Sequence, residues 1–298
     1  MKRNQLAGWA MLSPVILIFL ALGIFPLVYS AWLSFHRLNL LDPSRPAVPV
    51  GFGNYEQILF GHPISGITFL RSLGITAIIG GASLFLELFL GLVLAIIVSR
   101  TKASSLLRVM RTSLMVPMLI APAIIGMMFR FLFEPSYGFI NFVLSFVNIE
   151  PIYWISDPGV VLFSVVLVSV WTWLPFSFLV LLAGLNAIPQ EQYEAAAVDG
   201  AGVLQQVRFI MLPWLSRLLG VLVLIRGVEL IRTFDVVYTL TYGGPGVSSR
   251  TLAFSAYLTG FKYFEIGQAA AYAFLIMILI NIMIILFLRH LVPAEEER

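Results

Sequence analysis

The chain has 298 residues, of which 60% are hydrophobic and 11% are charged, and its formal net charge is +3. Soluble domains carry about a quarter charged residues, so this composition excludes a water-soluble core and indicates a membrane protein. The small positive charge does not indicate nucleic-acid binding, because the bases are spread through short segments and form no patch beside stacking aromatics.

Cysteine is absent, which excludes disulfide bonds, thiolate metal sites and cysteine nucleophiles. The three histidines, His36, His62 and His290, lie too far apart in the sequence to suggest a ligand cluster. We therefore expect no metal site in this chain.

The first apolar segment begins close to the N-terminus. Lys2 and Arg3 precede an uncharged run over residues 6–35, which is longer than the apolar core of a signal peptide and lacks a small-residue cleavage site. We expect it to stay attached as a membrane anchor, with a span at about 9–34. A bilayer core about 30 Å thick needs about 20 apolar residues in helical form. Further runs of that length predict spans at about 70–98, 112–133, 159–185 and 267–289.

A sixth candidate span, at about 214–240, is interrupted by charged residues. They are Arg217, Arg226, Glu229, Arg232 and Asp235. The distribution of bases nevertheless requires this crossing, because bases favour the cytoplasmic side of a membrane. Segment 99–111 carries four bases and no acid: Arg100, Lys102, Arg108 and Arg111. If that segment is cytoplasmic, the acidic segment 134–158 lies outside and 186–213 inside. A span between 213 and 267 then brings both termini to the cytoplasmic side.

Sequence motifs of catalysis are absent. The sequence contains no G-x-x-x-x-G-K-[ST] phosphate-binding loop, and neither H-E-x-x-H nor G-x-S-x-G occurs. We therefore expect no enzyme activity and no cofactor bound by this chain.

Residues 188–202 predict a short helix whose two ends are specified locally. Pro189 suits the first helical position, and Glu191 and Glu194 lie in the early turns, where carboxylates meet the positive end of the helix dipole. Gly200 or Gly202 can take the left-handed conformation that ends a helix. The expected helix, at about 189–201, is slim enough to enter a cleft on another protein. The alternative is an interfacial helix that only connects two spans.

Residues 201–212 also predict a helix, which Pro213 is expected to break or kink. The whole region resembles the membrane subunits of bacterial binding-protein-dependent importers, whose hallmark is E-A-A, three residues, G, nine residues and I-x-L-P. Both spacings are intact in this chain. The resemblance implies a coupling helix at about 189–201, seated in a groove of a separate ATP-hydrolysing subunit that binds ATP and magnesium. It assigns the coupling to Glu194, Ala195, Ala196, Asp199, Gly200, Ile210, Leu212 and Pro213.

A second run of residues narrows the resemblance to one group of these importers. Residues 232–246 are similar to the F-D-x-x-Y-x-L-T-x-G-G-P-G stretch of MalF-type and UgpA-type permeases of carbohydrate importers. Its glycine-rich end forms a turn that no helix continues through. The resemblance places this turn at the outer end of the fifth span, as a docking loop for the binding protein built from Gly243, Gly244, Pro245 and Gly246. Residues 52–55 are similar to a G-F-x-N-Y element in the first external loop of these subunits.

The resemblance implies an all-α membrane protein with six transmembrane helices and a type I ABC importer permease fold, forming one permease domain over 1–298. We expect a subunit of a bacterial or archaeal cytoplasmic membrane that forms half of the pathway for a sugar or sugar derivative. Its expected partners are a second, MalG-type permease, ATP-binding subunits and an extracytoplasmic solute-binding protein. A permease for a non-sugar solute is the first alternative. A secondary transporter is the second, although it would have no use for a coupling helix.

Charged side chains within the spans are expected to face protein or a watery cavity, because each costs about 2.5–3.5 kcal/mol at mid-bilayer. Intramembrane ionisable residues also mark functional sites by default. We therefore expect six residues to line or brace the translocation path: Glu87, Trp173, Glu229, Arg232, Asp235 and Tyr238. The alternative is that Arg226 pairs with Glu229, and Arg232 with Asp235, while all four pack between helices.

Overall fold

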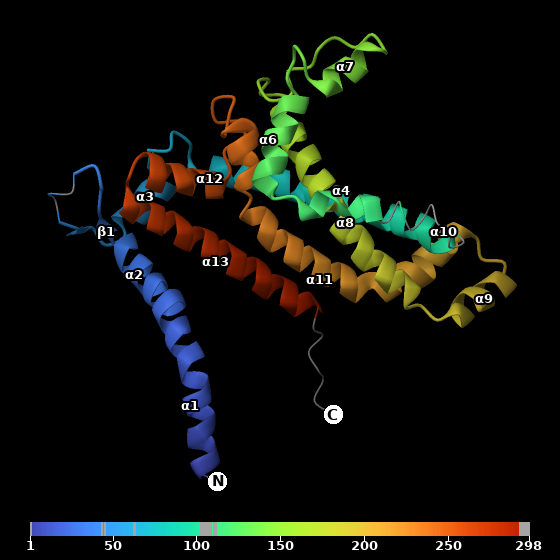
Figure 1. Ribbon diagram of the computed structural model, residues 1–298, viewed down its shortest axis with the longest axis horizontal. Helices are drawn as coiled ribbons and strands as arrows, with labels where there is room; N and C mark the ends of the chain where they lie inside the picture. Colours follow the sequence, from blue (N-terminus) through green and yellow to red (C-terminus); the bar gives the residue numbers. More distant parts are fainter. Residues whose placement is uncertain are drawn as a thin grey trace. The chain divides into compact units, whose positions relative to one another are not determined.

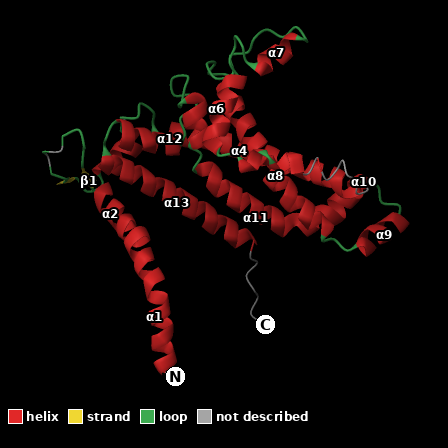
Figure 2. Ribbon diagram, viewed as in Figure 1, coloured by secondary structure: helices red, strands yellow, loops and turns green. Residues whose placement is uncertain are grey.

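The computed structural model describes residues 2–42, 44, 46–61, 64–101, 109 and 112–291. Three of the predicted cytoplasmic bases, Lys102, Arg108 and Arg111, and also His62 lie outside the described residues. Figure 2 shows that the described chain is mostly helical. The exceptions include two short antiparallel strands, β1 (His36–Arg37) and β2 (Val48–Pro49).

The chain divides into two compact units. Unit 1 comprises Met1–Phe69 and Ser255–Ile278, and unit 2 comprises Leu70–Phe254 and Leu279–Arg298. The predicted coupling and path residues all belong to unit 2.

Five described helical stretches are long and apolar enough to span a bilayer, and one bent pair adds a sixth. The first stretch combines α1 (Lys2–Phe19), the π-helical turn η1 (Leu20–Ile24) and α2 (Phe25–Ser34). The others are α4 (Phe69–Arg100), α8 (Val161–Asn186), the continuous helix Val203–Ile231 and α13 (Ile266–Leu291). The prediction of six spans is confirmed, because each apolar run is long enough to cross a bilayer core as a helix.

The third span is bent. The sequence predicted a span at about 112–133 but no bend within it. Residues Thr112–Leu119, ending in the 3-10 turn η2 (Pro117–Leu119), meet α6 (Pro122–Leu132) at 102°. Ile120 and Ala121 have extended backbone at the break. Pro122 explains the extended backbone beside it, since the residue before a proline disfavours the helical conformation.

The fifth span is also interrupted, so the prediction of one helix over about 214–240 is wrong in this respect. α11 (Leu212–Ile231) ends before the non-helical residues 232–234, and a second helical segment follows that includes η4 (Val237–Thr241). Irregular backbone at membrane depth is tolerated where protein buries it or where it lines a cavity. The two interrupted spans therefore mark the place in unit 2 where a polar site is expected.

Pro213 was expected to break or kink the helix, and it does not break it. The helix runs on from α10 (Val203–Gln206) through the π-helical turn η3 (Val207–Met211) into α11. Leu212 N–H donates to the carbonyl of Val207, five residues back. Pro213 directly follows this π-helical turn, and a local change of hydrogen bonding of this kind lets a helix continue past a proline.

In unit 1 the residues similar to G-F-x-N-Y connect α3 (Gly53–Leu59) to the end of α2. The Asn54 side chain donates to the carbonyls of Ser34 and His36, at 2.8 and 2.9 Å. The Tyr55 hydroxyl donates to the Ser34 hydroxyl at 2.7 Å. This element therefore fixes how the chain leaves the first span. The remaining elements are α7 (Phe139–Ser145), α12 (Leu252–Tyr257) and η5 (Leu258–Lys262).

The core of unit 2 lies where α4, α8, η3 and α11 pack together at one end of the bundle. Its buried residues are Ala95, Val98, Phe178, Leu181, Leu182, Leu185, Ile188, Met211, Leu215 and Leu222. Helices in a bilayer are held together by close packing of this kind, because lipid tails are as apolar as these side chains and supply no hydrophobic driving force. Figure 1 shows α9 (Gln190–Val198) beyond this end of α8 and α11. The packed core therefore lies next to the segments that connect α9 to these two helices.

Candidate functional site

α9 is an exposed helix and is shorter than predicted at both ends. Pro189 precedes the helix, with φ −58° and ψ 135°, and is not its first helical residue. The nine residues of α9 extend about 14 Å at 1.5 Å per residue. Glu194 and Asp199 are exposed, and the Gln190 side chain donates to Glu194 Oε1 at 2.9 Å. The carboxylate of Glu194 thus lies on a slim, accessible helix.

Gly200 ends α9 in the left-handed conformation predicted for it, with φ +74°. Its N–H donates to the carbonyl of Ala197 at 3.1 Å, and the N–H of Ala201 donates to the carbonyl of Ala196 at 2.8 Å. These two bonds form a Schellman motif, which satisfies carbonyls at the end of the helix. Nothing lies within 4 Å of where a Cβ would stand at Gly200. The need for glycine here is therefore conformational and not steric.

Polar contacts connect the end of α9 to α4. Arg100 Nη2 donates to Gln206 Oε1 at 2.7 Å, and Gln206 Nε2 donates to the carbonyl of Ala201 at 3.1 Å. A cavity of about 390 Å³ beside these groups is lined in part by Tyr193 and Arg100. Burial raises the pKa of Tyr193 above its usual value, and the nearby Arg100 charge opposes that shift. The phenol therefore stays neutral at physiological pH.

The second half of the predicted coupling motif has a different environment. Ile210 packs against the core of unit 2, whereas Leu212 and Pro213 are exposed at the start of α11. The motif therefore has two parts: the E-A-A part lies on the exposed helix α9, and the I-x-L-P part is attached to the buried core through Ile210.

A buried ion pair connects α4 to α11. Arg226 Nε donates to Glu87 Oε2 at 2.8 Å and Arg226 Nη2 donates to Glu87 Oε1 at 2.9 Å. The two side chains are 2% and 0% exposed. The Trp173 ring covers the guanidinium, with its centroid 4.2 Å from Cζ, and Ser169 also hydrogen-bonds to Glu87. Such bidentate, cation–π contacts are among the strongest available to an arginine.

The alternative in which Arg226 pairs with Glu229 is therefore wrong, since the partner of Arg226 is Glu87 on a neighbouring helix. Arg226 is buried, whereas Glu229, three residues further along α11, is exposed. Charges buried away from water need a partner that is buried with them, and Glu87 meets that condition.

A small pocket of about 70 Å³ lies beside the ion pair. Its lining residues are Pro122, Ser169, Trp173, Arg226, Glu229, Leu230, Arg232, Thr233, Phe234, Asp235 and Val236. Four of the predicted path residues are thus brought together there: Trp173, Glu229, Arg232 and Asp235. The pocket lies where the two interrupted spans meet, because Pro122 begins α6 after the bend and residues 232–234 form the break after α11.

The two remaining predicted path residues are not among those that line the pocket. Glu87 contacts two of its lining residues, Arg226 and Ser169, and Tyr238 stacks on Phe234 with ring centroids 5.3 Å apart. Sequence reasoning missed Pro122, Ser169 and Phe234 as lining residues. The proline gave a signal, since a proline within an apolar run marks a helix break, whereas serine and phenylalanine are too common in spans to stand out.

The glycine-rich segment after η4 is a turn, as predicted, and it is held by hydrogen bonds. Gly243 and Gly246 have φ of +77° and +59°. Gly243 N–H donates to Thr241 Oγ1 at 3.2 Å, and Ser249 Oγ donates to the carbonyl of Gly244 at 2.7 Å. A Cβ at Gly243 would overlap the side chains of Phe254 and Arg250. This position therefore requires glycine both because no room exists for a Cβ and because its φ is positive.

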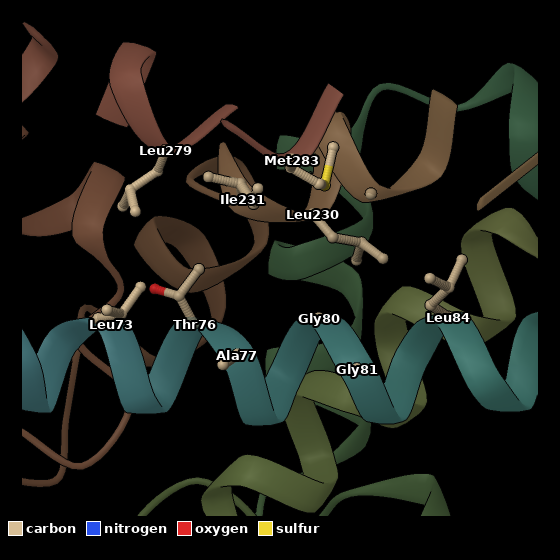
Figure 3. Close-up of a pocket in the computed structure, with 11 residues that line it drawn as sticks. Leu73, Thr76, Ala77, Gly80, Gly81, Leu84, Leu230, Ile231, Leu279 and Met283 are labelled. Carbon is tan, nitrogen blue, oxygen red and sulfur yellow. The ribbon is translucent and has the colours of Figure 1, made fainter. Parts of the chain in front are cut away.

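A larger cavity in unit 2, about 280 Å³, differs in chemistry from the pocket beside the ion pair. Figure 3 shows α4 residues along one side and side chains of α11 and α13 along the other, including Leu230, Ile231, Leu279 and Met283. Among its lining side chains only Thr76 is polar, and its hydroxyl already donates to Ser72 O at 2.8 Å and accepts from Leu252 N–H at 3.0 Å. This cavity therefore suits apolar groups and offers little to a hydroxylated solute.

Comparison with known proteins places the motifs in context. A family profile described as binding-protein-dependent transport system inner membrane component matches residues 87–296. The chain is 33% identical over 267 residues to the trehalose/maltose transport system permease protein MalF of Thermococcus litoralis, covering 89% of this chain and 86% of that protein. It is 30% identical over 281 residues to the sn-glycerol-3-phosphate transport system permease protein UgpA of Pectobacterium atrosepticum, covering 93% and 91%.

The fold also matches a solved structure. In the crystal structure of a bacterial alginate ABC transporter in complex with an alginate pentasaccharide-bound periplasmic protein, one chain superimposes with a TM-score of 0.80 at 21% identity. The match covers 96% of this chain and 93% of that chain. The fold expected from the sequence motifs is therefore confirmed.

Proposed function

Because this chain belongs to the family of binding-protein-dependent transport system inner membrane components, we propose that it is a permease subunit of an ATP-driven importer for a carbohydrate. Relatives that share about a third of its residues are permeases of trehalose/maltose and sn-glycerol-3-phosphate transport systems. The run at 232–246 supports the same solute class, because it is similar to the corresponding stretch of carbohydrate permeases.

The structure and position of α9 are the main support for this proposal. It is exposed, slim, ended by a Schellman turn and mounted on the buried core of unit 2. ATP hydrolysis is assigned to a separate subunit, because the sequence has no phosphate-binding loop of its own. Glu194 meets a base in a groove of that subunit, and Gly200 fixes the angle at which α9 enters it. Closure of the ATPases around ATP then moves α8 and α11, to which α9 is joined.

The pathway lies between this chain and a second permease, with the pocket beside the ion pair on its wall. The proposed orientation puts α9 and both termini in the cytoplasm and the turn at Gly243–Gly246 outside. A solute-binding protein delivers the carbohydrate at that turn. A binding protein in the related alginate transporter complex supports this partner.

The test is purification of an affinity-tagged chain from its native host in mild detergent. We expect a second permease and an ATP-binding subunit to copurify, and the ATPase activity of the complex to rise when carbohydrate-loaded binding protein is added. If the chain purifies without an ATPase and moves solute along an ion gradient, it is a secondary transporter and the proposal is wrong. If the complex responds only to a non-carbohydrate, the solute class is wrong and the permease assignment stands.

A further inference from the structure

The pocket beside the ion pair has a charge balance that bears on which carbohydrates it accepts. The named relatives handle both kinds, since trehalose and maltose are neutral and sn-glycerol-3-phosphate is an anion. Similarity alone therefore leaves the charge of the solute open, and the side chains of the pocket are the remaining guide.

The most buried base of the pocket has no charge to offer a solute. Arg226 is 1% exposed, donates two hydrogen bonds to Glu87 and lies under the Trp173 ring. Its positive charge is balanced by the Glu87 carboxylate within 3 Å. Drawing it toward an anionic solute would leave Glu87 buried and unpaired, which is strongly unfavourable.

The other charged residues that line the pocket are two acids and one base, Glu229, Asp235 and Arg232. All three are exposed, so they are accessible from the pocket mouth. Together with the neutral Arg226–Glu87 pair they give this lining one net negative charge. The carboxyl end of α11 and the amino end of α6 also meet here, and their opposite partial charges offset each other.

From this balance we infer that the carbohydrate carried by this chain is uncharged, and that a phosphorylated or acidic sugar is rejected at this pocket. The inference rests on the proposed function. An anion would bring like charge against the carboxylates of Glu229 and Asp235, and like charges placed side by side in an interface are unfavourable. Hydroxyl groups of a neutral sugar donate to Glu229 and Asp235 and accept from Arg232. Trp173 and Phe234 supply apolar ring faces for the C–H side of a sugar ring.

In this structure the pocket is small, about 70 Å³. A sugar ring therefore occupies the site only after the helices around it move apart. The breaks at residues 120–121 and 232–234 are the points of the two spans at which the regular helix is already interrupted, so we expect the movement there.

The test uses the complete transporter, with its binding protein, in liposomes loaded with ATP. Uptake is measured for labelled neutral probes (trehalose, maltose, glucose) and anionic probes (glucose 6-phosphate, sn-glycerol 3-phosphate, glucuronate). The variants are Glu229→Gln, Asp235→Asn and Arg232→Gln, with Glu150→Gln as a control, since Glu150 is exposed and outside the pocket lining. Variants of this chain link the result to the pocket and separate it from selection by the binding protein.

We expect uptake of neutral probes only, and an increase of about tenfold in KM with Glu229→Gln or Asp235→Asn, because each loses a charge-assisted hydrogen bond. Uptake of anionic probes that equals or exceeds that of neutral ones, with loss on Arg232→Gln, overturns the inference and leaves the carbohydrate importer intact. Unchanged KM in all three pocket variants also overturns it. Uptake of no carbohydrate of either charge, with uptake of another solute, overturns the proposed function instead.

Discussion

Glu87 and Arg226 illustrate at the residue scale why a charge inside a span is retained. The Arg226 and Glu87 side chains are 2% and 0% exposed to solvent, and two hydrogen bonds join them. The pair need not make the protein more stable than two apolar residues would. We expect its value to lie in specificity, because it joins one position of α4 to one position of α11 beside the pocket.

Removal of one partner is predicted to destabilise the subunit. Glu87→Gln leaves the Arg226 charge buried without a counter-charge, which costs about 3–5 kcal/mol. We expect a clear fall in the thermal unfolding midpoint of the detergent-solubilised complex, measured by the loss of its size-exclusion peak after heating. Glu150→Gln, on an exposed segment, is the matched control and leaves the midpoint unchanged.

The double variant Glu87→Gln with Arg226→Gln removes both charges and is predicted to recover part of the lost stability. If Glu87→Gln alone unfolds at the wild-type temperature, the pair does not hold α4 against α11 and this account of the helix register is wrong.

Gly126 supports a second prediction at this scale. It lies on α6 where η4 passes so closely that a Cβ would overlap Thr239 Oγ1. We expect Gly126→Ala to reduce the amount of assembled subunit in the membrane, because the overlap pushes α6 away from η4. Thr239→Ala in the same chain removes the overlapping atom and is predicted to restore assembly. Immunoblots of membranes measure both, and a Gly126→Ala variant that assembles normally contradicts the close approach.

At the scale of elements, α9 is predicted to transmit motion and not to bind solute. Gly200→Val puts a β-branched residue in a left-handed conformation, which costs about 1–2 kcal/mol, and nothing crowds the site otherwise. We expect loss of transport with the spans still inserted, and ATPase activity that no longer responds to loaded binding protein. Gly200→Asn is the matched control, because asparagine tolerates this conformation, and it is predicted to keep most of the activity.

Glu194→Lys tests the same helix through charge. The side chain is exposed, so its reversal does not disturb the fold of this chain but repels a base on the ATPase. Copurification of the ATPase with the variant is predicted to fall. Normal transport by both Glu194→Lys and Gly200→Val would remove the coupling role from α9.

The spans could be predicted from the sequence because apolar length is a local property. Hydropathy predicted five spans and the distribution of bases the sixth, and a glycine, Gly200 or Gly202, was predicted to end the helix at 189–201 because glycine takes the left-handed conformation. The bend at 120–121 and the break at 232–234 were missed, because tertiary packing decides whether a proline or a charged stretch interrupts a helix. The pairing of Arg226 with Glu87 joins residues 139 positions apart, which periodicity within one helix cannot show.

At the scale of the whole molecule, the orientation of the spans is predicted from the positions of the bases. The chain has no cysteine, so single cysteines can be introduced without background labelling. Thr101→Cys and Ser136→Cys replace exposed residues at two inter-span segments. In intact cells we expect an impermeant maleimide to label position 136 and not position 101. Labelling of position 101 from outside would invert the topology and place α9 on the wrong side for an ATPase.

The central claim is that this chain converts ATP hydrolysis by a partner into movement of a carbohydrate across the membrane. Its most direct test is uptake of labelled carbohydrate into liposomes that contain the whole complex, with loaded binding protein outside and ATP enclosed or omitted. The account predicts accumulation only with enclosed ATP, and its loss when Glu194→Lys replaces the wild-type chain. Equal accumulation without ATP, or full ATP-driven accumulation with Glu194→Lys, would contradict it.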